Sequence, residues 1–175
     1  MRIGLGYDNH RLAPGRPLVL GGVAVPSPVG EDAHSDGDVL IHAIVDALLG
    51  AIGAGDIGSH FPDSDPRWKG QASRLFLERA AEMVLARGLR IVNIDAVVIL
   101  EKVKLGPMKA EIARSIREIL APHHPLPEDA VSVKAKTNER CDAVGEGRAI
   151  AAHAVVLLAE AEGRRPRQDA SSGKE

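Results

Sequence analysis

The stretch from residue 34 to residue 52, HSDGDVLIHAIVDALLGAI, decides the fold. Its apolar residues recur at helical spacing from Val39 to Ile52, which predicts a helix over this segment. Ser35 or Asp36 is a suitable N-cap, and the glycines at positions 53 and 55 end the helix. Ahead of it, prolines and a glycine between positions 26 and 30 predict a loop.

The flanking segments alternate between strand and helix patterns. Strands are predicted at 2–7, 17–20, 23–25, 91–100, 130–137 and 149–158, and helices at 73–87, with Ser73 as a cap, and at 107–120. A polar loop with two glycines is predicted at 138–147. The period of the last apolar segment does not separate helix from strand, but its Val155-Val156 pair and the need to complete a sheet favour a strand. We therefore expect a two-layer α+β domain over residues 1–160, with a mixed four-stranded sheet and helices on one face. A disordered tail is expected over 161–175.

Composition narrows the classes of protein that the chain can be. Lys plus Arg is 22 and Asp plus Glu is 24, so the basic excess of a general nucleic-acid coat is absent. Aromatic residues make up only 2%, which leaves few platforms for base stacking. Cys141 is the single cysteine, which excludes an internal disulfide and a cysteine-rich zinc module. Because no signal peptide and no run of about 18 apolar residues is found, we expect a cytoplasmic protein without a membrane segment.

Acidic and imidazole side chains gather near the start of the chain and in the first helix. Asp8 and His10 are two residues apart, so an extended segment places both on one side of the backbone. Asp38, His42 and Asp46 recur every four residues and form a slanting line on one helix face. Asp8, His10 and His42 suit a divalent transition metal with a fourth position open, and Asp38 or Asp46 could orient His42. The alternative is that these residues bind no metal, because an isolated Asp-x-His is common and a single histidine on an apolar helix is usually a core residue.

Three further segments could bind phosphate or hydroxyl groups. His34 to Asp38 leads into a helix N-terminus, where bare amides and a serine hydroxyl suit a phosphate; an exposed loop residue is the alternative for His34. Gly55 to Asp65 combines glycines with acidic groups that accept hydroxyl protons, and a solvated, turn-rich loop is the alternative. Lys134 to Glu139 offers a hydroxyl and backbone amides at a strand end, and its carboxylate could hold a hard cation such as Mg²⁺. Taken alone, this last segment is only a strand end.

Together these motifs resemble one enzyme family over roughly residues 1 to 160. The motifs are Gly6-Tyr7-Asp8-Asn9-His10, Ala33-His34-Ser35-Asp36-Gly37-Asp38 leading into His42, Gly55-Asp56-Ile57-Gly58, Phe61-Pro62-Asp63-Ser64-Asp65-Pro66, Lys104, and Lys134-Ala135-Lys136-Thr137-Asn138-Glu139. Their order and spacing are similar to those of the 2-C-methyl-D-erythritol 2,4-cyclodiphosphate synthases of the non-mevalonate isoprenoid pathway.

The resemblance implies a metal-dependent site. It assigns Asp8, His10 and His42 as zinc ligands, and His34 and Thr137 as catalytic groups that stabilise the transition state. The substrate-binding residues that it implies are Asp8, Asn9, His10, His34, Ser35, Asp56, Ile57, Gly58, Phe61, Pro62, Asp63, Ser64, Asp65, Lys104, Ala135, Lys136, Thr137, Asn138 and Glu139. A second divalent cation, Mg²⁺ or Mn²⁺, would bind with the substrate diphosphate near Glu139.

The resemblance also implies a reaction and an assembly. The reaction would convert 4-diphosphocytidyl-2-C-methyl-D-erythritol 2-phosphate into the 2,4-cyclodiphosphate and CMP by intramolecular phosphoryl transfer, which is phosphorus-oxygen lyase chemistry. The family forms homotrimers with active sites between neighbouring subunits, so the strands would pack around a trimer axis. Two alternatives stay open: a metal-dependent phosphohydrolase that activates water with the same ligands, and a nucleotide-binding or trimeric interaction protein without catalysis.

One segment departs from the family pattern. Many members carry an aromatic residue followed by Gly-Arg-Gly-Glu, whereas the aligned stretch here is Ala143-Val144-Gly145-Glu146-Gly147-Arg148. The aromatic residue is absent, and the arginine and the glutamate are exchanged. The family's arginine role in a central cavity is therefore not transferred to Glu146, and a substitute role for Arg148 stays open.

Overall fold

The computed structural model describes residues 1–33, 36–62, 64–68 and 70–161, and its main sheet has five strands in the order β4-β1-β7-β5-β6. The strands are β1 (Arg2–Pro14), β4 (Val29–Glu31), β5 (Leu89–Ile99), β6 (Val131–Lys136) and β7 (Ala149–Glu160). β5 and β6 run parallel and the other neighbours run antiparallel, so the sheet is mixed, as expected. A separate ribbon pairs β2 (Leu18–Leu20) with β3 (Val23–Val25).

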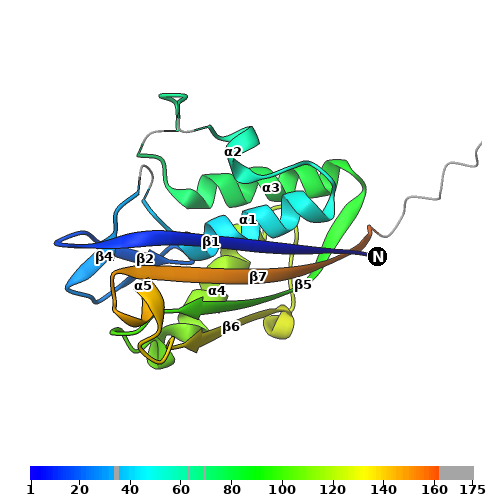
Figure 1. The fold of residues 1–175 in the computed structure, drawn as a ribbon. Coiled ribbons are helices and arrows are strands. Elements are labelled where there is room, and N and C mark those ends of the chain that lie inside the picture. The colour runs from blue at the N-terminus through cyan, green and yellow to red at the C-terminus, as the bar shows by residue number, and fades with distance from the viewer. Residues whose placement is uncertain (34–35, 63, 69, 162–175) are drawn as a thin grey trace, which may run out of the picture.

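Three long helices form the second layer (Figure 1). α1 (Val39–Ala51) packs on β1 and β7, α3 (Ser73–Ala86) packs on α1 and β5, and α4 (Lys109–Leu120) packs on β6. The shorter turns are α2 (Ile57–His60), η1 (Gly106–Met108), η2 (Glu128–Ala130) and α5 (Asp142–Gly145). Within the described ranges, no helix combines the length and the apolar character needed to cross a membrane.

Glycines allow α1 to lie directly on β1. A Cβ atom added at Gly4 would come within 1.9 Å of the carbonyl oxygen of Ala47, and one at Gly6 within 1.9 Å of that of Ala43. Any larger residue would therefore push the helix away from the strand. Since side chains alternate along a strand, the next helix-facing positions after these glycines are Asp8 and His10.

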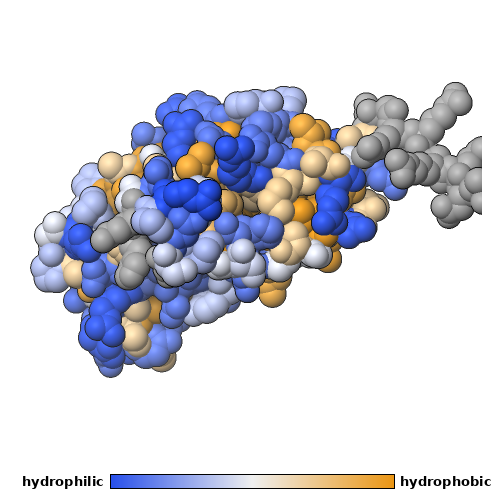
Figure 2. All heavy atoms as spheres, turned by 90° about the horizontal axis from the view of Figure 1, so that it is seen from above, coloured by the Kyte–Doolittle hydropathy of each residue, from blue (hydrophilic) through white to orange (hydrophobic). Residues whose placement is uncertain are grey.

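The opposite face of the sheet exposes apolar side chains. Ile3, Leu5 and Tyr7 on β1 are 71%, 68% and 50% exposed, and Val155 on β7 is also exposed. By contrast, the side of the molecule that carries α2 and α3 is mostly hydrophilic with scattered apolar patches (Figure 2). The sheet therefore has one face buried under helices and another face that presents apolar surface.

The expected four-stranded sheet is wrong, because β4 adds a fifth strand. β4 is only three residues long, contains Gly30 and directly follows Pro26 and Pro28, so its sequence carries no strand pattern. It pairs with the far end of β1, which continues to Pro14 instead of ending at Tyr7.

Two local predictions also need correction. The N-cap of α1 is Asp38, not Ser35 or Asp36, and its carboxylate accepts the N–H of Ile41 at 3.0 Å. The expected polar loop after β6 contains α5. The other long elements lie within a few residues of their predicted positions, and the helices lie on one face as expected. Of the tail expected over 161–175, residues 162–175 lie outside the described residues.

Candidate metal centre

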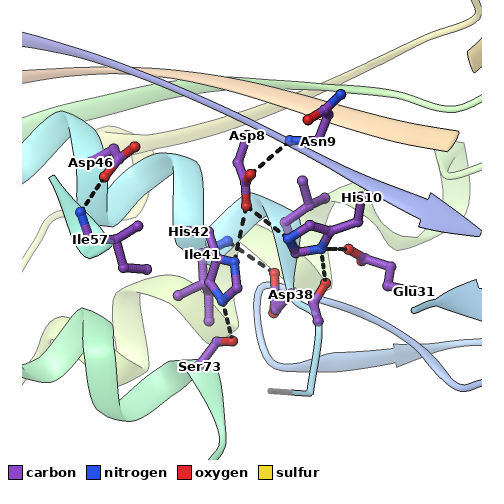
Figure 3. A network of polar contacts seen from close by, with 12 residues as sticks. Asp8, Asn9, His10, Glu31, Asp38, Ile41, His42, Asp46, Ile57 and Ser73 are labelled. Atoms are coloured by element: carbon purple, nitrogen blue, oxygen red, sulfur yellow. Dashed lines mark hydrogen bonds and ion pairs between the residues drawn. The ribbon is translucent and has the colours of Figure 1, made fainter. Parts of the chain in front are cut away.

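Three side chains from β1 and α1 meet at one point (Figure 3). Asp8 and His10 extend from β1 toward α1, where His42 lies in the first turns of the helix. Asp8 Oδ2 lies 3.0 Å from His10 Nε2 and 3.0 Å from His42 Nδ1. Candidate ligand atoms of all three residues lie within 4.8 Å of one another. The predicted grouping of Asp8, His10 and His42 is therefore confirmed.

Each imidazole uses its outer nitrogen for a separate polar contact. His10 Nδ1 lies 2.5 Å from Glu31 Oε2 and 2.9 Å from the carbonyl oxygen of Gly37. Because a carbonyl oxygen only accepts, His10 Nδ1 carries a proton. On the other ring, His42 Nε2 lies 2.9 Å from Ser73 Oγ. With this proton on Nδ1, a neutral His10 ring directs the lone pair of Nε2 toward the Asp8 carboxylate, so either a second proton or a metal cation is needed between the two groups.

The titration of the cluster points to the same need. Burial disfavours a charged imidazole, but hydrogen bonds to Asp8 and Glu31 outweigh it and raise the pKa of His10 to about 10. Burial alone would raise the pKa of Asp8, yet the close contacts of its carboxylate with the His10 and His42 rings hold it well below its usual range. A proton on His10 Nε2 thus supplies the positive charge, and a metal ion that binds here displaces it. Two imidazoles and one carboxylate fit zinc or a similar divalent metal.

Glu31 supports His10 from behind, and sequence reasoning missed it. Glu31 is buried, with 4% of the residue exposed, and its Oε2 also accepts the N–H of Val39 at 3.2 Å. Oε1 is buried and has no hydrogen-bond partner among the residues that the structure describes. Burial raises the pKa of Glu31 to about 7 against the opposing effect of His10. Nothing in the sequence signals this pairing, because Glu31 is 21 residues from His10.

Asp38 and Asp46 are the two residues that the sequence offers for orienting His42. In the structure both carboxylates accept hydrogen bonds from backbone N–H groups. Asp38 Oδ2 accepts the N–H of Gly22 at 2.7 Å in addition to capping α1, and burial raises the pKa of Asp38 to about 6. Asp46 Oδ1 accepts the N–H of Ile57 at 2.7 Å. The side chain that contacts the outer nitrogen of His42 is instead Ser73, the first residue of α3. Ser73 does not cap this helix, contrary to expectation, since the N-cap is Ala72.

The second predicted binding segment begins at α2. Asp56 Oδ1 caps this turn by accepting the N–H of Ser59 at 2.9 Å and its hydroxyl at 2.7 Å. Ile57 and Gly58 form the first turn of α2. The turn lies beside the cluster-bearing helix, because Asp46 of α1 holds the N–H of Ile57.

Farther along the same segment, aromatic packing holds Phe61 in place. Phe61 is buried, and its ring centroid lies 4.7 Å from that of Phe76 and 5.1 Å from that of Trp68. Asp65 forms an ion pair with Arg67 at 2.6 Å. Pro62 is partly buried and Ser64 is exposed. The predicted residues His34, Ser35 and Asp63 lie outside the described residues.

The third predicted segment lies at the carboxyl ends of the parallel strands β5 and β6. Lys136 ends β6, and the exposed Thr137 donates its hydroxyl hydrogen bond to Glu139 Oε1 at 2.8 Å. The Asn138 N–H donates to Glu101 Oε2 at 3.0 Å, which ties the segment to the end of β5. Ala135 is partly buried in β6 and Lys104 is exposed beyond β5.

Strand register separates this segment from the metal cluster. Asp8 is paired with Ala152, Ala152 with Val98, and Val98 with Ala135. Three strand intervals of about 4.8 Å place the Asp8 and Ala135 positions roughly 14 Å apart. Asn9, which alternates with Asp8, points away from the cluster (Figure 3). The structure therefore brings together the metal ligands of one chain but not the metal ligands and Thr137.

In the segment that departs from the family pattern, residues 143–148, the exchanged arginine and glutamate form an ion pair with each other. Arg148 Nε lies 2.6 Å from Glu146 Oε2, and both side chains are exposed. The two exchanged charges thus neutralise each other locally.

Comparison with known proteins agrees with this geometry. The model of the YgbB family matches residues 1–159. A protein of Gloeobacter violaceus named 2-C-methyl-D-erythritol 2,4-cyclodiphosphate synthase is 55% identical over 160 residues, which are 91% of this chain and 96% of that protein. The chloroplastic synthase of Oryza sativa is 50% identical over 157 residues, covering 90% of this chain and 69% of its own length.

Solved structures give the same result. A 2C-methyl-D-erythritol-2,4-cyclodiphosphate synthase in a CDP-bound form has a TM-score of 0.82 at 46% identity, covering 90% of this chain and 100% of that one. The CDP complex of Plasmodium falciparum IspF has a TM-score of 0.79 at 36% identity, covering 91% and 96%. The chain belongs to the YgbB family, whose relatives at this level of identity are named 2-C-methyl-D-erythritol 2,4-cyclodiphosphate synthases.

Proposed function

We propose that this chain converts 4-diphosphocytidyl-2-C-methyl-D-erythritol 2-phosphate into 2-C-methyl-D-erythritol 2,4-cyclodiphosphate and CMP. The observation that carries the proposal is the convergence of Asp8, His10 and His42 on one point in a chain of this family. The names of the relatives support the substrate and the product. The ligand in related structures, CDP, supports a cytidine nucleotide portion.

The reaction is an internal phosphoryl transfer. An oxygen of the 2-phosphate forms a bond to the β-phosphorus, and the bond from that phosphorus to the bridging oxygen breaks, so CMP leaves with the electron pair. The attacking phosphate is already an anion, so no general base is required. Positioning and charge neutralisation therefore supply most of the rate acceleration.

This chain's residues hold the charges that the reaction needs. Zinc bound by Asp8, His10 and His42 would supply positive charge to an oxygen of the β-phosphate. A second cation, Mg²⁺ or Mn²⁺, would be held near Glu139 together with the diphosphate. His34 and Thr137 are proposed as the groups that stabilise the transition state, and Thr137 would do so through its hydroxyl.

The remaining proposed substrate contacts divide between two segments. Asp56, Ile57, Gly58, Phe61, Pro62, Asp63, Ser64 and Asp65 would bind the methylerythritol phosphate portion, with Asn9 and Ser35 beside the metal ligands. Lys104, Ala135, Lys136, Asn138 and Glu139 would bind the cytidine and diphosphate portion. A cytoplasmic location is part of the same proposal.

We also propose a homotrimer with active sites between subunits. Thr137 must reach the same diphosphate as the metal cluster, yet within one chain about three strand intervals, roughly 14 Å, separate their sheet positions. A neighbouring chain can supply the missing half of the site. The apolar face formed by Ile3, Leu5, Tyr7 and Val155 supports burial against other copies around a threefold axis.

A product assay tests the reaction. Zinc-loaded protein with Mg²⁺ is incubated with the cytidyl substrate in water labelled with heavy oxygen, and products are followed by phosphorus NMR. We expect the cyclic diphosphate and CMP, neither of them labelled. A labelled, ring-free phosphate product would instead establish a phosphohydrolase, and zinc retention without turnover would establish a binding protein.

A further inference from the structure

Two residues outside the metal cluster control how His42 faces it. Ser73 is fully buried at the start of α3, with its hydroxyl oxygen 2.9 Å from His42 Nε2. The same hydroxyl contacts Asp36 Oδ1, and the Ser73 N–H donates to Asp36 Oδ2 at 3.0 Å. Asp36 therefore engages both hydrogen-bond donors of Ser73.

The direction of these hydrogen bonds follows from the number of protons. An ionised carboxylate only accepts, and a serine hydroxyl has a single proton to donate. Ser73 gives that proton to Asp36, so its oxygen can only accept from His42. His42 Nε2 must then carry the ring proton, and Nδ1, 3.0 Å from Asp8 Oδ2, is left with a lone pair.

We propose that Ser73 and Asp36 are positioning residues that fix His42 in the Nε2–H tautomer, so that Nδ1 is ready to bind the metal. The inference rests on the proposed metal-dependent function. His10 reaches the equivalent state differently, because the Gly37 carbonyl beside its Nδ1 enforces a proton there. The two metal-binding rings are thus oriented by separate devices, from the loop before α1 and from the start of α3.

Substitution of Asp36 by asparagine offers a sharp test, because the change keeps the shape of the side chain. The amide oxygen of D36N can still accept the Ser73 N–H, while its NH₂ group donates to Ser73 Oγ. The Ser73 proton is then free to point at His42 Nε2, which favours the Nδ1–H tautomer that cannot bind a metal. S73A removes the contact altogether and leaves the tautomer unfixed.

The experiment measures zinc affinity and the His42 tautomer in separate arms. Metal-free wild type, D36N, S73A and the control S115A are titrated with Zn²⁺ against a chromophoric chelator, and circular dichroism checks folding. Ser115 is a matched control, since it lies on α4, outside the cluster, and its hydroxyl donates to the carbonyl of Gly21. We expect D36N and S73A to bind zinc about 10–100-fold more weakly and S115A to match wild type.

In the second arm, nitrogen-15 NMR of the metal-free proteins, at a pH where the ring is neutral, assigns the protonated nitrogen of His42. We expect Nε2–H in wild type and S115A, and Nδ1–H in D36N. Unchanged zinc affinity in folded D36N and S73A, or the same tautomer in wild type and D36N, would overturn the inference. Failure of wild type to bind zinc would instead overturn the proposed function, and the NMR arm would still decide the tautomer.

Discussion

The metal cluster and the segment from Thr137 to Asp142 carry the proposed chemistry, but they are built in opposite ways. Most contacts in and around the cluster join residues 21 to 37 positions apart, and they come mainly from β1, β4, α1 and α3. In the other segment most polar contacts join residues two to four positions apart, and most of its side chains are exposed. Glu139, Arg140 and Asp142 there adopt positive φ angles.

The difference indicates what each region needs in order to work. The cluster is preformed by the core of a single chain, so it should bind metal without substrate. The second segment is held mainly by its own turns, and its strand position lies roughly 14 Å from that of the cluster, so a neighbouring chain should complete the site.

The largest effect is expected from His42→Ala, which breaks the cluster alone. The variant should fold, lose zinc, and release CMP about a thousandfold more slowly, because a bound metal supplies several kcal/mol of charge stabilisation. Zinc content and CMP release measure the outcome, with circular dichroism as the check on folding. Near-normal CMP release by this variant would contradict the assignment of the site.

A charge on the apolar sheet face should break the assembly while sparing the cluster. Leu5→Asp should shift the mass from trimer to monomer in light scattering and reduce turnover more than about a hundredfold, because every site loses its second half. Zinc binding should persist. Leu85→Asp is the matched control, since Leu85 is an exposed leucine on α3, away from this face. A trimeric Leu5→Asp variant would contradict the proposed interface.

Thr137→Ala should damage the second region alone. Loss of a hydroxyl that stabilises the transition state should cost about a hundredfold in turnover, with zinc content unchanged. Co-expression of Thr137→Ala with His42→Ala should then restore activity, since a mixed trimer contains sites built from two intact halves. Random equal mixing should give about one quarter of wild-type turnover. Absence of any recovery in mixed trimers would place both halves of the site in one chain.

The smallest effect is expected on the free energy of unfolding, and it comes from the buried residue His124. His124 is 3% exposed, donates to the Ala81 carbonyl at 3.0 Å, and accepts the N–H of Ile91 at 3.5 Å. Burial lowers the pKa of His124 below its ordinary value. The unfolded chain therefore takes up a proton first as the pH falls below about 6.5, and the free energy of unfolding decreases. Above that pH the contribution is fully present.

Urea unfolding at pH 7.5 and at pH 5.5 measures this contribution. His124→Gln should lose less stability in acid than wild type, because a glutamine side chain does not titrate in this range. Equal acid sensitivity of His124→Gln and wild type would show that this histidine does not titrate differently on folding.

The sequence allowed the long elements and the ligand triad to be predicted for different reasons. The apolar period from Val39 to Ile52 marks α1 because core burial and helix geometry repeat together. β4 and α5 were missed because their conformations come from pairing with β1 and from a run of positive φ angles. Tertiary contacts of this kind leave no local pattern.

The candidate site shows the same division. Asp8, His10 and His42 were predicted from residue type, spacing and family resemblance, and the structure brings them together. Glu31 and Ser73, which contact the outer ring nitrogens, were missed because their sequence distances from those rings are 21 and 31 residues. Supporting contacts depend on how layers meet, which spacing along the chain does not record.

The most direct test of the account is the structure of zinc-loaded crystals, with the metal located by anomalous scattering at its absorption edge. We predict one strong peak bonded to Asp8 Oδ2, His10 Nε2 and His42 Nδ1 at about 2.0–2.2 Å. Zinc bound through the opposite nitrogen of either ring, or the absence of a peak between these three side chains, would contradict the account.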